Sequence, residues 1–306
     1  MMLAAIDAGS NTLRLLIGQI ENARVVPSLY VRRICRLAGG FDIEKGLSPE
    51  AMERTLFAFR ELAKICHDHH VQALKVVGTA AFRQAKNGED FAHQVRCRTH
   101  LPLQIITGEY EAEIMTAGVL SALDPVPCHA LIVDIGGGST EFVLCSAGQV
   151  LWVRSLPLGV VRLIEGYEGK DARQHTISRA LAELNRELVT VCAAKGIDVG
   201  SLSLVGTAGT VTTLAALDLQ MTEYDWQRIN NHIMPLSRLL FWQALIEPLT
   251  LSEREALPGM EPGRGDLVQA GIEIVVCLMQ QLKISSLTVS DSGILEGLLL
   301  SLKSTE

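Results

Sequence analysis

The sequence predicts an α/β protein of two related lobes, each with a mixed β-sheet and flanking helices. An acidic turn occurs twice between apolar runs, with Asp7 in AAIDAGSNTLRLLIG and Asp134 in VDIGGGSTEF. A strand-to-helix turn also occurs twice, as VGTAAF from Val77 and as VGTAGT from Val205. The two members of each pair are separated by nearly the same number of residues, which indicates an internal duplication. For either acidic turn taken alone, an ordinary hairpin is the alternative.

In each half, hairpin strands precede strand–helix units, which is the order expected of a mixed sheet covered by helices. In the first half the patterns predict strands 3–7, 13–20 and 24–31, a helix from about 49 to 68, strand 73–77, helical segments to about 99, strand 103–106 and helix 109–121. In the second half they predict strands 130–134, 139–145 and 149–154, helices around 158–166 and 174–195, strand 202–205, a helical region from about 210 through 283, strand 286–290 and helix 293–302.

The proline pair in Asp124-Pro125-Val126-Pro127 predicts a domain boundary, with lobes at residues 1–124 and 125–306. Two lobes of this kind would leave a cleft between them, and we expect both acidic turns to face it.

Composition narrows the class of protein. The 306 residues are 48% hydrophobic and 20% charged, as in globular proteins, and the net charge of −7 argues against a broad nucleic-acid-binding surface. No charge-free apolar run approaches the roughly 20 residues needed to span a bilayer, and the N-terminus lacks a signal-peptide pattern. The seven cysteines are scattered without a C-x-x-C pair, so we expect reduced thiols and a cytoplasmic location.

Two short polar clusters have competing explanations. Arg32, Arg33 and Arg36 in YVRRICRLAGGF could form a ligand patch, or they could be charges on a solvated strand edge that oppose aggregation. The histidines of CHDHHVQ resemble a metal cluster, but polar or cationic residues at the end of a helix need no metal to explain them.

The acidic turns carry the features of a phosphate and metal site. Glycines and small hydroxyl residues leave backbone N–H groups exposed, and such groups can hold a phosphate. Asp7 and Asp134 would bring two carboxylates without adjacent cations into the cleft, which favours a divalent ion: Mg²⁺, or Mn²⁺ as the alternative. Glu141 would face the same side only if the glycine turn is tight, and a solvated strand glutamate is the alternative.

Further candidates lie at helix starts. ITGEYEAEIM offers Glu109, Glu111 and Glu113, but acids near a helix N-terminus are favoured by the helix dipole, and periodicity does not choose a base among them. The second VGTA turn, with Gly206 and Thr207, suits an anion through its N–H groups, although such turns also occur as plain connections.

Taken together, the motifs make the chain resemble the exopolyphosphatase and guanosine pentaphosphate phosphatase family over nearly its whole length. The resemblance is carried, in order, by DAGSNTLRLLIG, VGTAAFRQAKNG, GEYEAEI, VDIGGGSTE, PLGVVRL, VGTAGTVTTLAAL and LPGMEPGRGDLVQAG. It implies the superfamily of actin-like ATPases and sugar kinases, and therefore two ribonuclease-H-like lobes with a phosphate site in the cleft. It also implies a lobe boundary near residue 124 and a last helix, at about 293–306, that returns to the first lobe.

The resemblance also implies roles for individual residues. Glu111, which precedes an alanine in the G-x-x-E-A stretch, matches the catalytic glutamate that orients or deprotonates water, and Arg83 matches the arginine of the GT-x-x-x-R-x-A segment. The magnesium-side acids match Asp7, Asp134 and Glu141. The predicted phosphate-binding residues are Ser10, Asn11, Thr12, Arg83, Gly136, Gly137, Gly138, Ser139 and Thr140, together with Gly206 and Thr207.

We therefore expect a magnesium-dependent phosphohydrolase that releases terminal phosphate from inorganic polyphosphate. Guanosine pentaphosphate 5′-phosphohydrolase activity is the alternative, and an ATPase or kinase of the superfamily and a non-catalytic sensor of phosphorylated ligands are alternatives of other classes. A kinase would need a second substrate pocket and an aspartate base, whereas the G-x-x-E-A glutamate indicates water as the acceptor. We expect neither nucleic acid nor membrane as a partner, and a homodimer is left open.

Overall fold

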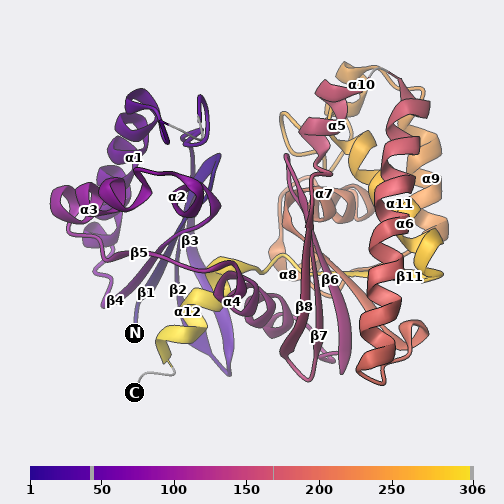
Figure 1. Cartoon of the computed structure of the whole chain (residues 1–306), viewed down its shortest axis with the longest axis horizontal. Helices are drawn as coiled ribbons and strands as arrows, with labels where there is room; N and C mark the ends of the chain where they lie inside the picture. The colour runs from indigo at the N-terminus through magenta and orange to yellow at the C-terminus, as the bar shows by residue number, and fades with distance from the viewer. Residues whose placement is uncertain (42–44, 168, 304–306) are drawn as a thin grey trace. The chain divides into compact units, whose positions relative to one another are not determined.

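The structure is a computed structural model that describes residues 1–41, 45–167 and 169–303 (Figure 1). The chain divides into two compact units: unit 1 comprises Met1–Ser121 and Gly293–Glu306, and unit 2 comprises Ala122–Ser292. The sequence placed the boundary near residue 124 and expected the last helix to return to the first lobe. In the structure the chain enters unit 2 at Ala122 and leaves it after Ser292.

Unit 1 contains a five-stranded sheet in the order β3-β2-β1-β4-β5. β1, β2 and β3 pair antiparallel, whereas β1, β4 and β5 are parallel. The strands are β1 (Leu3–Ala8), β2 (Thr12–Glu21), β3 (Arg24–Ile34), β4 (Ala73–Gly78) and β5 (Leu103–Ile105). The helices are α1 (Pro49–Asp68), α2 (Ala80–Gln84), α3 (Gly88–Thr99), α4 (Gly108–Ser121) and α12 (Ile294–Lys303).

Helix α1 illustrates how local signals and packing agree. The Ser48 side chain accepts a hydrogen bond from the Ala51 N–H, and Pro49 begins the helix, where its missing N–H costs nothing. Phe59 and Leu62 lie on the buried face of the helix, in one core cluster with Ile6 of β1. Burying a side chain of this size contributes about 1.5 to 3 kcal/mol, so this face fixes α1 against the sheet.

Unit 2 contains a six-stranded sheet in the order β10-β11-β9-β6-β7-β8. The strands are β6 (His129–Ile135), β7 (Thr140–Ser146), β8 (Gln149–Leu156), β9 (Ser203–Thr207), β10 (Ile233–Pro235) and β11 (Ser286–Val289). The helices are α5 (Val160–Gly166), α6 (Lys170–Ala194), the 3₁₀ turn Val199–Ser201, α7 (Ala208–Asp218), α8 (Trp226–Ile229), α9 (Leu236–Ile246), α10 (Leu251–Glu255) and α11 (Val268–Leu282).

The two sheets share one topology. In each, three antiparallel strands are followed by two strands that run parallel to the first: β1 to β5 in unit 1, and β6 to β9 with β11 in unit 2. This repeat confirms the predicted α/β fold of two actin-like domains with mixed sheets. In both units the acidic turn follows the first strand and the VGTA turn follows the fourth, so both motifs come to the same edge of their own sheet.

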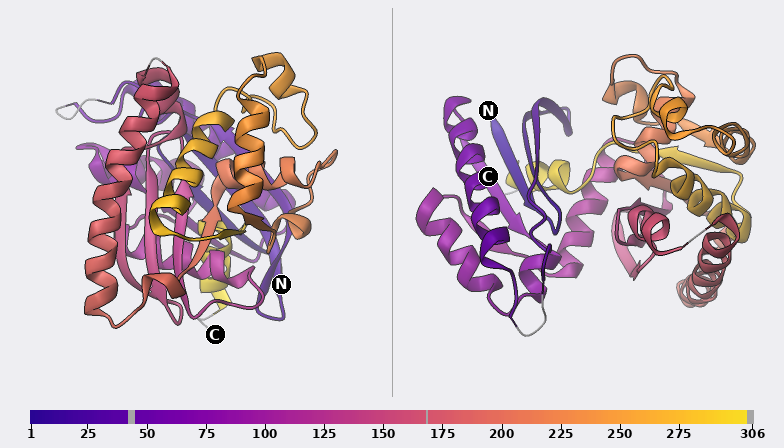
Figure 2. Two further views of the ribbon diagram at one scale, coloured as in Figure 1. Left: turned by 90° about the vertical axis from the view of Figure 1, so that its right-hand side faces the viewer. Right: turned by 90° about the horizontal axis from the view of Figure 1, so that it is seen from above.

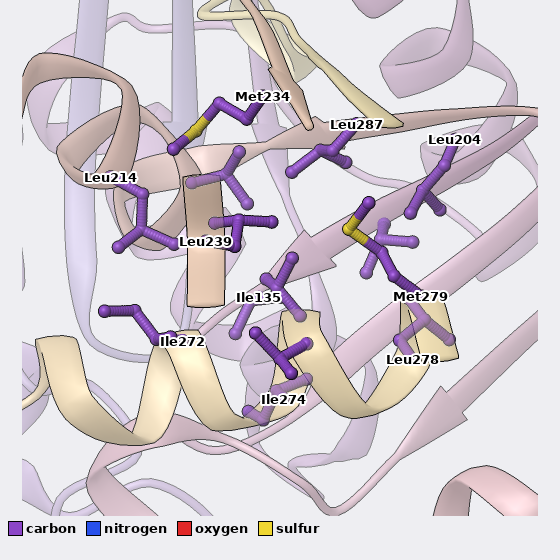
Figure 3. Close-up of a cluster of buried hydrophobic side chains, with 14 of the residues drawn as sticks. Ile135, Leu204, Leu214, Met234, Leu239, Ile272, Ile274, Leu278, Met279 and Leu287 are labelled. Carbon is purple, nitrogen blue, oxygen red and sulfur yellow. The ribbon is translucent and has the colours of Figure 1, made fainter. Parts of the chain in front are cut away.

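The core of unit 2 is built around α11, which lies between α6 and α9 and contacts both (Figure 2). Figure 3 shows Met279 of α11 near Leu204 of β9 and Leu287 of β11, and Ile274 of the same helix near Ile135 of β6, all within one core cluster. The same helix carries Glu273, whose carboxylate is almost fully buried and accepts two hydrogen bonds from the guanidinium of Arg173 on α6, at 3.0 and 3.1 Å. A charge is therefore compensated inside an otherwise apolar layer.

The sequence predicted a helical region from about 210 through 283, and this prediction is wrong for part of the region between its first and last helices. The short strand β10 and the connection between α10 and α11 interrupt it. β10 has only three residues and pairs antiparallel with β11, so it is too short to show a strand periodicity in the sequence.

Helix α12 packs against α4 of unit 1 through glycines. A Cβ atom added to Gly118 would lie 1.9 Å from the carbonyl oxygen of Gly293, and one added to Gly297 would lie 1.9 Å from that of Ile114. Lys75 of β4 donates hydrogen bonds to Tyr110 on α4 and to Ser301 on α12. Close backbone contact and this lysine hold the returning helix on unit 1.

All seven cysteines are free thiols, as the sequence predicted. Among the residues that the structure describes, no helix is both long enough and apolar enough to cross a bilayer.

Candidate functional site

The turn between β1 and β2 in unit 1 presents its N–H groups outward. The Gly9 N–H donates to the Thr12 carbonyl at 3.0 Å and closes the turn. The segment after β3 donates backbone hydrogen bonds of 2.8 to 2.9 Å to the turn carbonyls: Cys35 and Arg36 to Asn11, and Ala38 to Ser10. In the described part of the chain, the N–H groups of Ser10 and Asn11 have no acceptor. Because the Ser10 and Asn11 carbonyls are occupied and the N–H groups of these two residues are not, the turn suits an anion.

Asp7, at the end of β1, is paired with Arg14 on the neighbouring strand. The Arg14 Nε and Nη2 atoms lie 3.0 and 2.5 Å from Asp7 Oδ2, so the expectation of a carboxylate without an adjacent cation is wrong for Asp7. Its other oxygen, Oδ1, is buried and accepts no hydrogen bond within the described ranges. A buried carboxylate oxygen without a donor is uncommon, and a metal ion or a bound water would satisfy it.

The glycine turn of unit 2 has the same arrangement as the turn of unit 1. The Gly136 N–H donates to the Ser139 carbonyl at 2.9 Å. The first turn of α5 covers the turn carbonyls: Val160 donates to Gly136, and Val161 and Arg162 both donate to Gly137, at 3.0 to 3.1 Å. The N–H groups of Gly137, Gly138 and Ser139 meet no acceptor in residues 1–41, 45–167 and 169–303. Each unit therefore has one turn with outward N–H groups.

Gly159 makes the second turn possible. A Cβ atom at this position would lie 2.2 Å from the Gly137 carbonyl oxygen and 2.4 Å from the Gly138 carbonyl carbon, far below any normal contact. Only glycine allows the segment before α5 to reach the turn. Its residue type is set by a close approach to the turn backbone.

We expect Gly159→Ala to lower the free energy of unfolding by about 1 to 3 kcal/mol or more, because the atoms in its way belong to the backbone and cannot rotate aside. Phosphate release should fall with it. Gly166→Ala is the matched control, since an added Cβ there meets nothing within 4 Å. Equal melting temperatures for the two variants in thermal denaturation would show that the turn can shift at little cost.

Asp134 and Glu141 form a carboxylate pair in unit 2. They stand directly opposite each other in the antiparallel pairing of β6 and β7, which settles that Glu141 faces the same side as Asp134. Glu141 also accepts a hydrogen bond from Ser155 on β8 at 2.7 Å. In unit 1 the position seven residues after the aspartate is Arg14 instead, so the pair with two negative charges belongs to unit 2. Two like charges on one face favour a bound cation.

The donor set fits Mg²⁺. This ion prefers oxygen ligands, needs one or two carboxylates, and usually completes its shell with phosphate and water oxygens. Asp134 and Glu141 supply such a pair within unit 2. No group of three or more His, Cys, Asp or Glu side chains in the described ranges could hold a metal, so the protein alone does not offer a closed structural site.

The base predicted by family resemblance, Glu111, is held by the predicted phosphate ligand Arg83. The Arg83 Nη1 atom on α2 donates to Glu111 Oε2 at 2.7 Å and to the Ile106 carbonyl at 3.0 Å, and both side chains are about one third exposed. Glu109 differs from Glu111. Its own backbone N–H and the Thr107 hydroxyl lower the pKa of its carboxyl, which makes it a poorer proton acceptor.

The glycines of the two VGTA turns belong to strands, and packing leaves no room for a Cβ atom at either position. A Cβ at Gly78 would lie 2.8 Å from the Phe82 ring, and one at Gly206 would lie 2.7 Å from Val211. Both clashes involve side chains of the following helix. Ala208, the first residue of α7, has a left-handed backbone with φ of 64°, which is uncommon for a residue with a Cβ and is often found at functional sites.

Two predicted phosphate ligands have hydroxyl groups that are already occupied. Thr140 is fully buried and donates to the Leu158 carbonyl at 2.5 Å, and Thr207 donates to the Ser292 carbonyl at 2.9 Å. These hydrogen bonds stabilise the turns next to Thr140 and Thr207. Any contact of these two residues with phosphate would have to use the backbone.

Sequence reasoning missed two arginines. Arg14 is paired with Asp7, and it stands where the repeat places Glu141 in unit 2, so a comparison of the two halves could have found it. The Arg264 guanidinium lies against Gly209 near the start of α7, where a Cβ would be 2.1 Å from its Nη2, and it is paired with Glu261. Arg264 belongs to the LPGMEPGRGDLVQAG motif, but its distance in sequence from the second VGTA turn does not indicate that the two lie together.

A repeated mixed sheet, outward N–H groups at both acidic turns and a carboxylate pair define a phosphohydrolase of the actin-like two-domain class. The model of the Ppx/GppA phosphatase family matches residues 19–306, and the chain belongs to this family. It is 34% identical to exopolyphosphatase 2 of Mycobacterium tuberculosis over 98% of both chains. The crystal structure of the Aquifex aeolicus member of the Ppx/GppA family covers 100% of this chain, with 99% of its own chain matched, at a TM-score of 0.83 and 31% identity.

An exopolyphosphatase structure from Cytophaga hutchinsonii also matches, with a TM-score of 0.82 at 24% identity over 100% of this chain and 98% of that chain. At this identity the match supports the fold alone.

Proposed function

We propose that the protein is a magnesium-dependent exopolyphosphatase that releases terminal phosphate from inorganic polyphosphate. The observation that carries the proposal is the repeated turn with outward N–H groups, which suits a phosphate in each unit. The curated relative that is 34% identical over 98% of both chains is named an exopolyphosphatase, which favours polyphosphate as the substrate.

In the proposed reaction, a water oxygen forms a bond to the terminal phosphorus, and the bond from that phosphorus to the bridging oxygen breaks. Glu111 accepts the water proton, and the shortened chain leaves with the electron pair of the broken bond. The turn N–H groups hold the phosphate oxygens, where they stabilise charge that develops in the transition state. Bound at Asp134 and Glu141, the metal ion would neutralise part of that charge.

The ion pair of Arg83 and Glu111 gives Arg83 two proposed tasks. It orients the Glu111 carboxylate at 2.7 Å, and its remaining N–H donors bind phosphate oxygens. A guanidinium can do both, since it has five N–H donors in a planar arrangement.

We expect phosphate release to require a divalent cation, because Asp134 and Glu141 without one would repel a polyanion. Excess chelator should abolish release, and Mg²⁺, or Mn²⁺ as the alternative, should restore it. Glu141→Gln should raise the Mg²⁺ concentration needed for half-maximal activity. Glu165→Gln, at an exposed position on α5, is the control for loss of one carboxylate. Undiminished release in chelator would contradict the metal proposal.

The alternative substrate is guanosine pentaphosphate, whose 5′ end also presents a terminal phosphate in an anhydride bond. Phosphate release from both substrates, compared with Mg²⁺ at matched concentrations of terminal phosphate, tests the choice. A higher kcat/KM for the nucleotide would overturn the proposal in favour of 5′-phosphohydrolase activity.

We also propose a cytoplasmic location, which the seven free cysteines support.

A further inference from the structure

The arginine cluster that the sequence left unexplained is divided by the structure. Arg33 is paired with Glu61 of α1. Arg32 stands opposite Arg14, next to the Asp7 pair. Arg36 lies beyond the strand, in the segment that covers the acidic turn of unit 1, and its N–H donates to the Asn11 carbonyl at 2.8 Å. The cluster is therefore not one patch, and only Arg36 is attached to the turn.

The Arg36 side chain is exposed and has no ion pair or hydrogen bond among the described residues. Its backbone is left-handed, with φ of 47°, a conformation in which arginine is uncommon and glycine or asparagine is favoured. An arginine that only opposed aggregation would need neither a left-handed backbone nor a backbone hydrogen bond to the turn. The conformation and the bond to the turn place an uncompensated guanidinium next to N–H groups that suit an anion.

Unit 2 repeats this arrangement at Arg162. The Arg162 N–H on α5 donates to the Gly137 carbonyl of the glycine turn at 3.1 Å. Its side chain is exposed and likewise without a partner in the part of the chain that the structure describes. Other arginines near the turns are neutralised, since Arg14 is paired with Asp7 and Arg264 with Glu261. Each turn thus has one arginine attached through its backbone whose charge is uncompensated.

We propose that Arg36 and Arg162 each bind polyphosphate at the phosphates that follow the one held by the turn of their own unit, and so set the preference for longer chains. The proposal rests on the proposed function for the substrate class. A single phosphate can be held by the N–H groups of a turn, whereas the following phosphates each carry further negative charge that needs a donor outside the turn. A guanidinium on a flexible stem beside the turn supplies such a donor, and its bond to a phosphate is charge-assisted.

The test measures binding and hydrolysis separately. Binding of long polyphosphate is titrated with Mg²⁺ in the Glu111→Gln variant, where hydrolysis should be at least about two orders of magnitude slower. The KM values for long polyphosphate and tripolyphosphate are measured with Mg²⁺ in the protein that keeps Glu111. Arg36→Gln and Arg162→Gln should each weaken binding of the long chain about tenfold, the effect of one charge-assisted hydrogen bond. Each should raise the KM of the long chain more than that of tripolyphosphate.

The double variant should lose about a hundredfold, because the two arginines are attached to different turns and share no hydrogen-bond partner. Removing one phosphate contact should also reduce the slope of log Kd against log salt concentration by about one.

The matched controls are Arg60→Gln on α1 and Arg179→Gln on α6, which remove one exposed positive charge from each unit away from the turns. Arg36→Lys keeps the charge, so it should retain most of the binding that Arg36→Gln loses. The inference is overturned if Arg36→Gln and Arg162→Gln bind the long chain as the controls do, or if the Glu111→Gln protein with both arginines in place binds no polyphosphate with Mg²⁺ present. Binding that depends on both arginines without any phosphate release would instead overturn the proposed function and leave the inference standing.

Discussion

Replacing Glu111 with glutamine should lower kcat for phosphate release by at least about two orders of magnitude, because a general base typically contributes about 10² to 10⁴ in rate. Glutamine keeps the size of the side chain and can still accept a hydrogen bond from Arg83, but it cannot take a proton from water. KM and the melting temperature should stay close to those of the unaltered protein, since the ion pair it replaces is about one third exposed and contributes little to stability.

The neighbouring acids are the controls for this prediction. Glu109→Gln and Glu113→Gln should act mainly on stability, through the favourable position of acids near the start of α4. For Glu109 the lowered pKa means that its charge stabilises the fold above the carboxyl's ordinary pKa, and that this contribution is lost as the pH falls through the lowered value. If Glu109→Gln is the inactive variant, or Glu111→Gln keeps most of its turnover, the base has been placed wrongly, and Glu141 is the next candidate.

The second large effect is expected at the buried ion pair of unit 2. Glu273→Leu should lower the free energy of unfolding by about 3 to 5 kcal/mol, because it leaves the Arg173 guanidinium buried between α6 and α11 without its partner. Arg173→Met should have a similar effect, since it leaves the Glu273 carboxylate uncompensated. The measurement is chemical denaturation of each variant at neutral pH.

The double variant Arg173→Met/Glu273→Leu decides between two explanations. If the penalty arises from an unpaired buried charge, the double variant should be more stable than either single variant, because hydrophobic residues of similar volume often replace a buried pair at little cost. Losses that simply add would mean that the two side chains act by packing alone. Lys170→Met/Glu247→Leu is the matched control, since this pair is partly exposed and should change stability by about 1 kcal/mol or less.

Repetition made most of the fold predictable. Hairpin strands followed by strand–helix units appear twice in the sequence, and the five strands of the first sheet have counterparts in the same order in the second, which adds β10 at its edge. β10 escaped prediction because three residues carry no periodicity, and its place in the sheet depends on pairing with β11. The return of α12 depends on a close crossing with α4, where Gly118 and Gly297 approach the backbone of the other helix.

The candidate site was predictable to the extent that its chemistry is local in sequence. The turns at Asp7 and Asp134 could be identified because their glycines and hydroxyl residues are neighbours in the chain. The pairing of Asp7 with Arg14 was not recognised, although both belong to one hairpin, because composition does not state which strand residues stand opposite each other. The link between Arg83 and Glu111 joins two helices and could not be read from their spacing.

The sequence by itself determined the duplication, the class of fold and the two acidic turns, and through family resemblance it predicts Glu111 as the base. These depend on local backbone preference and on patterns that repeat along the chain, and both are properties of neighbouring residues. Only the tertiary structure decided that Glu141 faces the same side as Asp134 and that Arg173 is neutralised by Glu273. It also decided that other segments donate to carbonyls of both acidic turns while further N–H groups of these turns stay unpaired among the described residues. Strand register, burial and hydrogen-bond partners depend on contacts between different strands and helices, and these contacts form only when the sheets and helices pack together.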